Sequence, residues 1–443
     1  MGVLTMVGQV MLALAILITL HELGHFWAAR AFGIRVEKFF LFFDAWGLKL
    51  FSFKKGDTEY GIGWLPLGGY VKIAGMVDES LDKEQLNTPP QSWEFRSKPA
   101  WQRLIVMLGG VTVNAILGIL IMSLSLMYYG DEYMPNANVK YGVHALPLGK
   151  KIGFLDGDKI VNINGQALDK FSDALNPKVI LGDGTYYVVD RNGQQITIKT
   201  PNNFEDLYTK LGKDSGFIVE RRKFKLGNIG PATPAAKFDL RTDDYILSID
   251  SHIITYFDEV KRVLKPNTQQ TFVILRGKDT LKKVIKIEKE AIVGFNPIAY
   301  EYDSLSKKQY YSIVEAFPEG TKRAKELIAT QLVAFGKMFK GEMDPRKSLA
   351  GPIQIGKLFG ENWDWFRFWG FTAMISIVLA FMNLLPIPAL DGGHVVFLIV
   401  EMVIRRPLPE KFMYFMQMVG MFILLALMIF IFGNDIVQTW FSN

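Results

Sequence analysis

An uncharged apolar run from Val3 to Leu20 leads directly into the motif His21-Glu22-Leu23-Gly24-His25. A membrane helix needs about 20 such residues. An ionisable side chain at membrane depth costs roughly 2.5 to 3.5 kcal/mol on insertion scales, so the cluster indicates a functional site. Residues four apart share one helix face, which lets His21 and His25 bind one metal ion with Glu22 near a metal-bound water. The motif predicts a zinc hydrolase. Its alternative, surface histidines on a soluble helix, does not fit the apolar run.

The composition indicates a chain with membrane and soluble parts, because 49% of its 443 residues are hydrophobic and 21% are charged. Its net charge of +6 comes from Lys and Arg interspersed with acids, which excludes nucleic-acid binding. The chain has no cysteine, so any zinc ligands must be His, Asp or Glu.

About four transmembrane segments are expected. The first is retained, because it lacks a basic leader and a cleavage site. The other three are residues 104–129, 365–387 and 415–432. Basic residues concentrate in 30–103 and 405–411, which the positive-inside rule places in the cytoplasm. Both termini and the long region 130–364 are then extracytoplasmic.

Alternating residues between the first two spans predict a membrane-associated sheet of β-hairpins, with strands over 48–53, 58–64 and 69–73. Its faces are rich in Phe, Trp and Tyr, so we expect it to dip into the membrane interface near the metal. Its open edge could then pair with a substrate strand. The alternative is an ordinary cytoplasmic hairpin with one apolar face.

The extracytoplasmic region contains an internal repeat, in which Leu155–Gly165 recurs as Arg241–Ser251. Each copy follows a short helix signal, and this order resembles PDZ domains. PDZ domains bind extended peptide ends by strand addition. A spacer that blocks access to the site is the alternative, and both roles can coexist as a size filter.

The third span ends in the segment Met382-Asn-Leu-Leu-Pro-Ile-Pro-Ala-Leu-Asp-Gly-Gly-His394. This segment contains a second acid at membrane depth, Asp391. The two prolines cannot continue a regular helix, so the freed backbone groups must face protein or water. Catalytic zinc usually has three protein ligands, and Asp391 would complete the set begun by the two histidines. His394 is an alternative ligand. His144 and His252 are expected to be ordinary surface residues.

These motifs together resemble the site-2 protease family (M50) of intramembrane zinc metalloproteases, in its bacterial RseP type with tandem PDZ domains. The resemblance covers nearly the whole chain. It implies a zinc metalloendopeptidase of the bacterial inner membrane that uses one Zn2+ ion. Its implied substrates are pre-trimmed single-span membrane proteins, such as an anti-sigma factor, and remnant signal peptides; its other partners are membrane lipids.

The resemblance also implies residue roles. Asn383 would hydrogen-bond the substrate backbone, and Gly68, Gly69, Tyr70 and Val71 would line the substrate path. The second span departs from the family's Gly-Pro-x-x-Asn pattern, since this chain reads Gly109-Gly110-Val-Thr-Val-Asn114, which puts a role for Asn114 in doubt. The second repeat also has Ser251 where a glycine is expected.

The expected fold is a membrane α-helical protein with about four transmembrane helices, a membrane-associated β-hairpin sheet and two extracytoplasmic PDZ-like α+β domains. Its predicted parts are a catalytic region (1–130), two PDZ-like domains (131–215 and 216–295), a linker with an amphipathic helix over 320–340 (296–364), and a C-terminal membrane region with the third ligand (365–443). A membrane metal transporter and a noncatalytic PDZ scaffold are the alternative functions.

Overall fold

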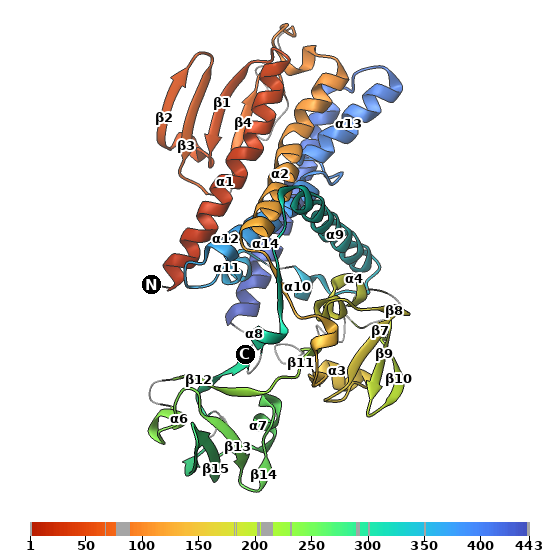
Figure 1. Cartoon of the computed structure of the whole chain (residues 1–443). Coiled ribbons are helices and arrows are strands. Elements are labelled where there is room, and N and C mark those ends of the chain that lie inside the picture. The colour runs from red at the N-terminus through yellow and green to blue at the C-terminus, as the bar shows by residue number, and fades with distance from the viewer. Residues whose placement is uncertain are drawn as a thin grey trace. The chain divides into compact units, whose positions relative to one another are not determined.

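The structure is a computed structural model of the whole chain. It describes residues 2–66, 68–76, 89–180, 182, 184–201, 204, 216–230, 233–288, 293–299, 302–349 and 351–440. The chain forms two compact units (Figure 1). The membrane unit comprises Met1–Gly130, Tyr310–Gly336 and Pro345–Asn443, and the inserted unit comprises Asp131–Gln309 and Lys337–Asp344. The finer division into five parts stays a prediction.

Four helices of the membrane unit are long and apolar enough to cross a membrane, as the sequence predicts. They are α1 (Gly2–Ala31), α2 (Ala100–Tyr128), α12 (Trp365–Asn383) and residues Lys411–Val437 of α14 (Glu410–Trp440). The helix α13 (Asp391–Ile404) follows α12 and has 14 residues, too few to span.

The fourth span is longer at both ends than predicted, Lys411–Val437 instead of 415–432. Two further span boundaries differ from the prediction for identifiable reasons. The helix α2 begins at Ala100 instead of residue 104, and its first turns include Arg103, whose charge is paired with Glu401 of α13. The helix α12 ends at Asn383 instead of residue 387, because prolines at 386 and 388 cannot continue it.

Glycines let the spans pack closely. A side chain on Gly109 of α2 would lie 2.5 Å from the Gly24 carbonyl oxygen of α1, so the two backbones touch where they cross. Small residues at such crossings are usual in membranes, because lipid chains leave close packing as the main attraction between helices. On the other side, Ser376 of α12 donates a hydrogen bond to the Asn114 carbonyl of α2, at 2.7 Å. The helix α2 therefore packs between α1 and α12.

A four-stranded sheet follows α1, with strands β1 (Val36–Leu41), β2 (Lys49–Lys55), β3 (Thr58–Gly63) and β4 (Tyr70–Ile73). The predicted strands correspond to β2, β3 and β4, whereas β1 was not predicted from the sequence. Their order is β2-β3-β1-β4, because β1 pairs in parallel with β3 and antiparallel with β4. Within the described residues β4 is therefore an edge strand.

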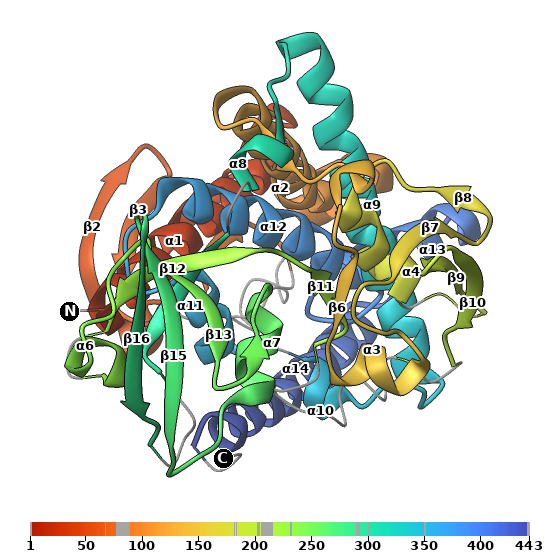
Figure 2. The same cartoon turned by 60° about the horizontal axis from the view of Figure 1, so that its bottom comes forward.

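The predicted repeat appears in the inserted unit as two four-stranded sheets of the same order. Strands β7, β9 and β10 of the first (Lys159–Ile163, Tyr186–Arg191, Gln194–Lys199) correspond to β13, β15 and β16 of the second (Tyr245–Ile249, Gln269–Arg276, Asp279–Lys286). In both sheets the central pair is flanked by a hairpin strand, β8 (Gln166–Ala167) or β14 (His252–Ile253). Figure 2 shows the four strands of the first sheet. Each sheet packs its own apolar core.

An equivalent buried ion pair ties each sheet together. In the first copy Arg191 binds both carboxylate oxygens of Asp158 at 2.7 Å, and in the second Arg276 binds both oxygens of Asp244 at 2.8 Å. The same arginine also donates to the backbone of the loop before its aspartate. Two-pronged pairs of this kind are the stronger ones.

The remaining elements connect these parts. Those of the inserted unit are β5 (Asp131–Tyr133), β6 (Val143–Ala145), α3 (Pro147–Ile152), α4 (Pro177–Ile180), β11 (Ile218–Glu220), β12 (Phe224–Ile229), α6 (Pro234–Lys237), α7 (Phe257–Val263), β17 (Phe295–Ala299), α8 (Tyr302–Leu305) and β18 (Lys307–Gln309). Next come α9 (Ile313–Phe339), α10 (Pro345–Ser348) and α11 (Pro352–Phe359). The expected amphipathic helix over 320–340 is part of the longer α9.

The ion pair of the second copy gives a stability prediction. Replacing Asp244, which is 1% exposed, by Asn should lower the local free energy of unfolding by about 2 kcal/mol, because charge-assisted hydrogen bonds to Arg276 are lost. Hydrogen exchange of β13 and β15 amides in the full chain measures this. Asp243→Asn is the control, because Asp243 is 65% exposed and its pair with Lys225 should contribute little. Equal protection in both variants would contradict the prediction.

Candidate metal centre

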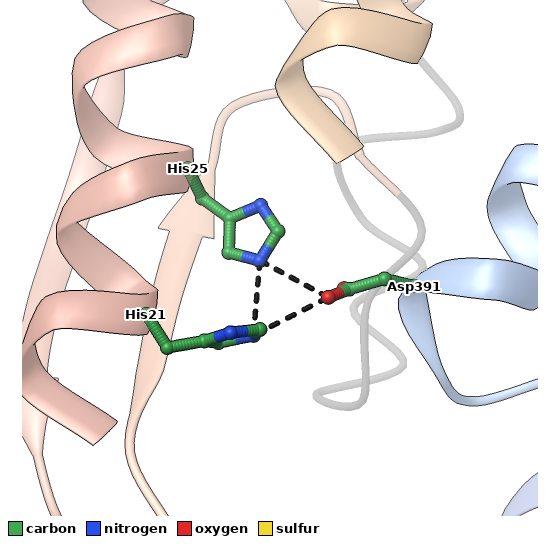
Figure 3. Close-up of side chains that lie close together, drawn as sticks. All are labelled: His21, His25 and Asp391. Carbon is green, nitrogen blue, oxygen red and sulfur yellow. Dashed lines mark hydrogen bonds and ion pairs between the residues drawn. The ribbon is translucent and has the colours of Figure 1, made fainter. Parts of the chain in front are cut away.

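The helix α1 brings His21 and His25 to one face, as their spacing predicts. Their Nε2 atoms lie 3.2 Å apart, and the rings meet edge to face with centroids 4.8 Å apart (Figure 3). Both side chains are largely buried, with exposed fractions of 12% and 8%. Two nitrogen donors therefore converge inside the helix bundle.

Asp391 joins the two histidines from the other end of the chain. It is the first residue of α13, directly after the turn that follows α12. Its Oδ2 atom lies 3.3 Å from the Nε2 atom of each imidazole, and Figure 3 shows the three side chains pointing toward one another. The structure thus brings together the three residues that the sequence singles out as metal ligands.

The spacing of these three atoms fits a tetrahedral zinc site. Ligand atoms about 2.0 to 2.2 Å from zinc at tetrahedral angles lie about 3.3 to 3.6 Å from one another, close to the observed 3.2 and 3.3 Å. The Oδ2 atom of Asp391 is also buried without a hydrogen-bond partner. Buried polar atoms are normally paired, so this oxygen has the surroundings of a metal ligand.

Hydrogen bonds outside this triangle orient the histidines. The Nδ1 atom of His25 lies 2.8 Å from the Val106 carbonyl oxygen, which fixes the ring proton on Nδ1 and leaves the Nε2 lone pair for a metal. His21 has a similar neighbour, because its Nδ1 atom is 3.3 Å from the side-chain amide of Asn114.

Asn114 is a site residue that sequence reasoning left without a clear role. Its side-chain oxygen is buried and has no partner, whereas its nitrogen faces His21. Rotating the amide by 180° exchanges the two atoms and gives the His21 Nδ1–H an acceptor. A polar residue inside an otherwise apolar span was the signal available in the sequence.

Comparison with known proteins agrees with this geometry. A sequence profile of peptidase family M50 matches residues 9–427. The chain belongs to peptidase family M50. Similar relatives are the regulator of sigma E protease of Haemophilus influenzae (29% identical, 99% of this chain and 100% of the relative), a putative zinc metalloprotease of Neisseria meningitidis (27%, 96% and 97%) and the metalloprotease MmpA of Caulobacter vibrioides (26%, 98% and 96%). The predicted family and metalloprotease activity are confirmed, and the predicted zinc cofactor agrees with the names of these relatives.

Glu22, the predicted general base of this M50 peptidase, lies on α1 between His21 and His25. The strand β4 approaches it, because a side chain on Gly69 would lie 3.7 Å from the Glu22 Cγ atom and 2.6 Å from Ile18. The edge strand of the sheet therefore runs directly beside the predicted general base.

Tyr70 is fixed within the sheet instead of projecting into the site. Its hydroxyl donates to Asp44 at 2.7 Å, and its ring stacks on Phe40 and Phe43. Burial alone would raise the pKa of Asp44, but hydrogen bonds from Tyr70 and Lys38 hold it below its usual value. Asp44 is therefore charged at neutral pH and holds the Tyr70 side chain within the sheet. The backbone of β4, and not the Tyr70 side chain, is then what a substrate could pair with at the open edge.

Asn383 and His394 flank the metal ligands differently. Asn383 ends α12, and its side-chain nitrogen lies 3.3 Å from the metal-facing Nε2 atom of His21. His394 is buried but, among the described residues, does not belong to the group that could hold an ion. The candidate metal site of this M50 peptidase thus groups His21, His25 and Asp391, and Asn383 lies next to His21.

A second group, in the inserted unit, contains His144, Asp156 and Asp258. The His144 Nδ1 atom lies 2.6 Å from Asp156, so this residue is not the ordinary surface histidine expected from the sequence. The guanidinium groups of Arg221 and Arg262 already pair with Asp258. These cations occupy the place of a metal ion, and the group is an ionic network.

Gly110 gives a prediction for the metal centre. A side chain there would collide with the His25 Nε2 atom and lie 2.6 Å from the His21 ring, so Gly110→Ala should weaken metal binding roughly 10- to 100-fold. The control is Gly8→Ala on α1, where the added methyl group meets nothing within 4 Å. Metal content after chelator challenge measures both. Full retention in Gly110→Ala would contradict the proposed ligand geometry.

Proposed function

We propose that the chain is a zinc-dependent endopeptidase that cuts a peptide bond within the transmembrane segment of another membrane protein. The observation that carries this proposal is the depth of the site. His21, Glu22 and His25 belong to the spanning helix α1, and Asp391 reaches them from the turn after the spanning helix α12. A substrate peptide bond must therefore come to the interior of the helix bundle.

The proposed reaction is hydrolysis with Glu22 as general base. When bound by His21, His25 and Asp391, zinc polarises the scissile carbonyl and makes water more acidic. Glu22 takes one proton from the attacking water as the new carbon–oxygen bond forms. It then delivers this proton to the amine as the carbon–nitrogen bond breaks. The Asp391 carboxylate offsets part of the metal's positive charge.

A substrate helix must unwind before it can react, because its carbonyls are hydrogen-bonded within the helix. The edge of β4 lies beside Glu22 and can hold the unwound strand by backbone pairing. Gly68, Gly69, Tyr70 and Val71 thus form one side of the proposed substrate path. Asn383 is proposed to hydrogen-bond the substrate backbone, and its position 3.3 Å from the Nε2 atom of His21 supports this role.

The sheet itself is proposed to dip into the membrane interface. The strand β2 is exposed along its whole length and presents Leu50, Phe51 and Phe53. Trp46 and Trp64 stack on each other and are also exposed. Aromatic residues gather at membrane–water interfaces, so lipid is the environment that suits this surface.

The inserted unit is proposed to act as a size filter or peptide sensor formed by two PDZ-like domains. Its support is the repeated sheet order and the repeated Asp–Arg pair. The main segment of the unit begins at β5 and ends at β18. These two strands pair with each other, so the two ends of this segment lie side by side.

The proposed location is the bacterial inner membrane, with the inserted unit and both termini extracytoplasmic. Basic residues between α1 and α2 and after α13 support this orientation. The proposed substrates are pre-trimmed single-span proteins of the anti-sigma factor type and remnant signal peptides. The name of the Haemophilus influenzae relative, a regulator of sigma E protease, supports the first of these.

A variant that loses the general base Glu22 but keeps the metal ligands tests the proposed hydrolysis. Glu22→Gln should keep zinc and lower cleavage of a transmembrane reporter roughly 10²- to 10⁴-fold, the usual contribution of a general base. Glu288→Gln, at an exposed position of the inserted unit, is the control. Zinc content and the rate of reporter cleavage are measured together. Cleavage by Glu22→Gln at the wild-type rate would refute the proposed mechanism.

Excising residues 132–308, the main segment of the inserted unit, tests the size filter. Joining residue 131 to residue 309, which are partners in the β5–β18 ladder, should leave the membrane unit in place and remove the barrier. The shortened chain should then cleave a reporter with a bulky outer domain as fast as its trimmed form, whereas the full chain prefers the trimmed one. Cleavage rates of the two reporters measure this. An unchanged preference after excision would show that the filter lies elsewhere.

A further inference from the structure

The helix α14 contacts the turn that carries Asp391. The side chain of Gln417 on α14 is buried, and its Oε1 atom accepts a hydrogen bond from the Ala389 backbone amide at 3.3 Å. Ala389 lies two residues before Asp391. Gln417, a polar residue of an apolar span, therefore hydrogen-bonds the backbone of this turn.

Ala389 needs such support because of its conformation. Its φ angle is +76°, in the left-handed region that residues other than glycine rarely adopt. A strained residue of this kind persists only where its surroundings hold it. Without Gln417 its amide would also lack a partner inside the apolar bundle, where water cannot replace the lost bond.

A glycine brings the α14 backbone against the same turn. A side chain on Gly420 would collide with the carbonyl group of Pro388. From the other side, a side chain on Gly393 of α13 would lie 2.6 Å from the Ile387 carbonyl oxygen. The turn is thus enclosed between α14 and the start of α13, and it has little freedom to shift without moving Asp391.

We propose that Gln417 and Gly420 are positioning residues for Asp391. Together they hold the turn from 386 to 390 in the strained form that presents the carboxylate to His21 and His25. This proposal rests on the proposed role of Asp391 as a metal ligand. It makes α14 part of the metal centre, although no described side chain of α14 belongs to the ligand group.

The packing of α14 gives this arrangement a mechanical consequence. Only 11% of the most apolar stretch of α14 is buried inside the structure, compared with 17% for α1 and 39% for α2 and for α12. A helix with so few internal contacts is displaced more easily than its neighbours. If α14 moves away from the turn, Ala389 loses its acceptor and relaxes, and Asp391 leaves its place. The position of α14 therefore sets the affinity for the metal.

A matched pair of glycine variants on α14 tests the proposal. Gly420→Ala in the purified full chain should lower zinc affinity at least 10-fold, measured by competition with a chromophoric chelator. Gly433→Ala makes the same change on the same helix, where the methyl group meets nothing within 4 Å, and should leave the affinity unchanged. Equal affinity in the two variants would overturn the role of Gly420.

A second series tests Gln417 without adding bulk. Gln417→Met keeps the length of the side chain but removes the acceptor, and should lower zinc affinity about 10-fold. Adding Ala389→Gly should recover part of this loss, because glycine adopts a positive φ without strain. A purely structural role of Gln417 predicts no such recovery. Gln417→Met with wild-type affinity would overturn the proposal even if Gly420→Ala fails to fold.

Asp391→Ala separates this proposal from the proposed function. If Asp391→Ala leaves zinc affinity unchanged, Asp391 is not a ligand and both proposals fail. If Asp391→Ala weakens zinc binding but Gln417→Met and Gly420→Ala do not, only the positioning role fails. Loss of affinity in all three variants, with Gly433→Ala unaffected, is the expected result.

Discussion

The whole arrangement depends on keeping two imidazoles and a carboxylate inside an apolar helix bundle. Ionisable groups at membrane depth are costly unless they are paired or bind a metal. Here His21, His25 and Asp391 converge within 3.3 Å of one another, and the facing oxygen of Asp391 has no other partner. In the proposed site a divalent cation bound by all three groups would offset this cost, because it would take the place of water as their partner.

The fold around this cluster is built to bring two distant chain segments together. Glycines at 24, 109 and 110 let α1 and α2 cross so closely that the imidazoles fit between them. Prolines after α12 end that helix and create the turn from which Asp391 projects. Backbone groups left free by the turn are satisfied from within the protein, one of them by Gln417. The sheet then brings an open strand edge to Glu22.

The parts of this fold that follow local rules could be predicted from the sequence. Helical spacing placed His21 and His25 on one face, hydropathy identified four spans, and the recurrence around Asp158 and Asp244 identified the repeat. Asp391 could be assigned because a carboxylate at membrane depth is costly unless it meets a cation, and the two histidines supply a site for one.

Features that depend on which helices meet could not be predicted. The strand β1 pairs in parallel with β3, a pairing that no hairpin pattern indicates. The roles of Gly110 and Asn114 follow from the crossing of α1 and α2, and that of Gln417 follows from the contact of α14 with a strained residue. For Asn114 and Gln417 the sequence offered one signal, an uncharged polar side chain in an apolar span. It did not show which residue that side chain contacts.

X-ray absorption spectroscopy of zinc in the purified full chain tests the central claim most directly. The account predicts two imidazole nitrogens and oxygen ligands at about 2.0 to 2.2 Å around a four-coordinate ion. A zinc shell with fewer than two imidazoles would contradict it, because His21 and His25 would then not share one metal.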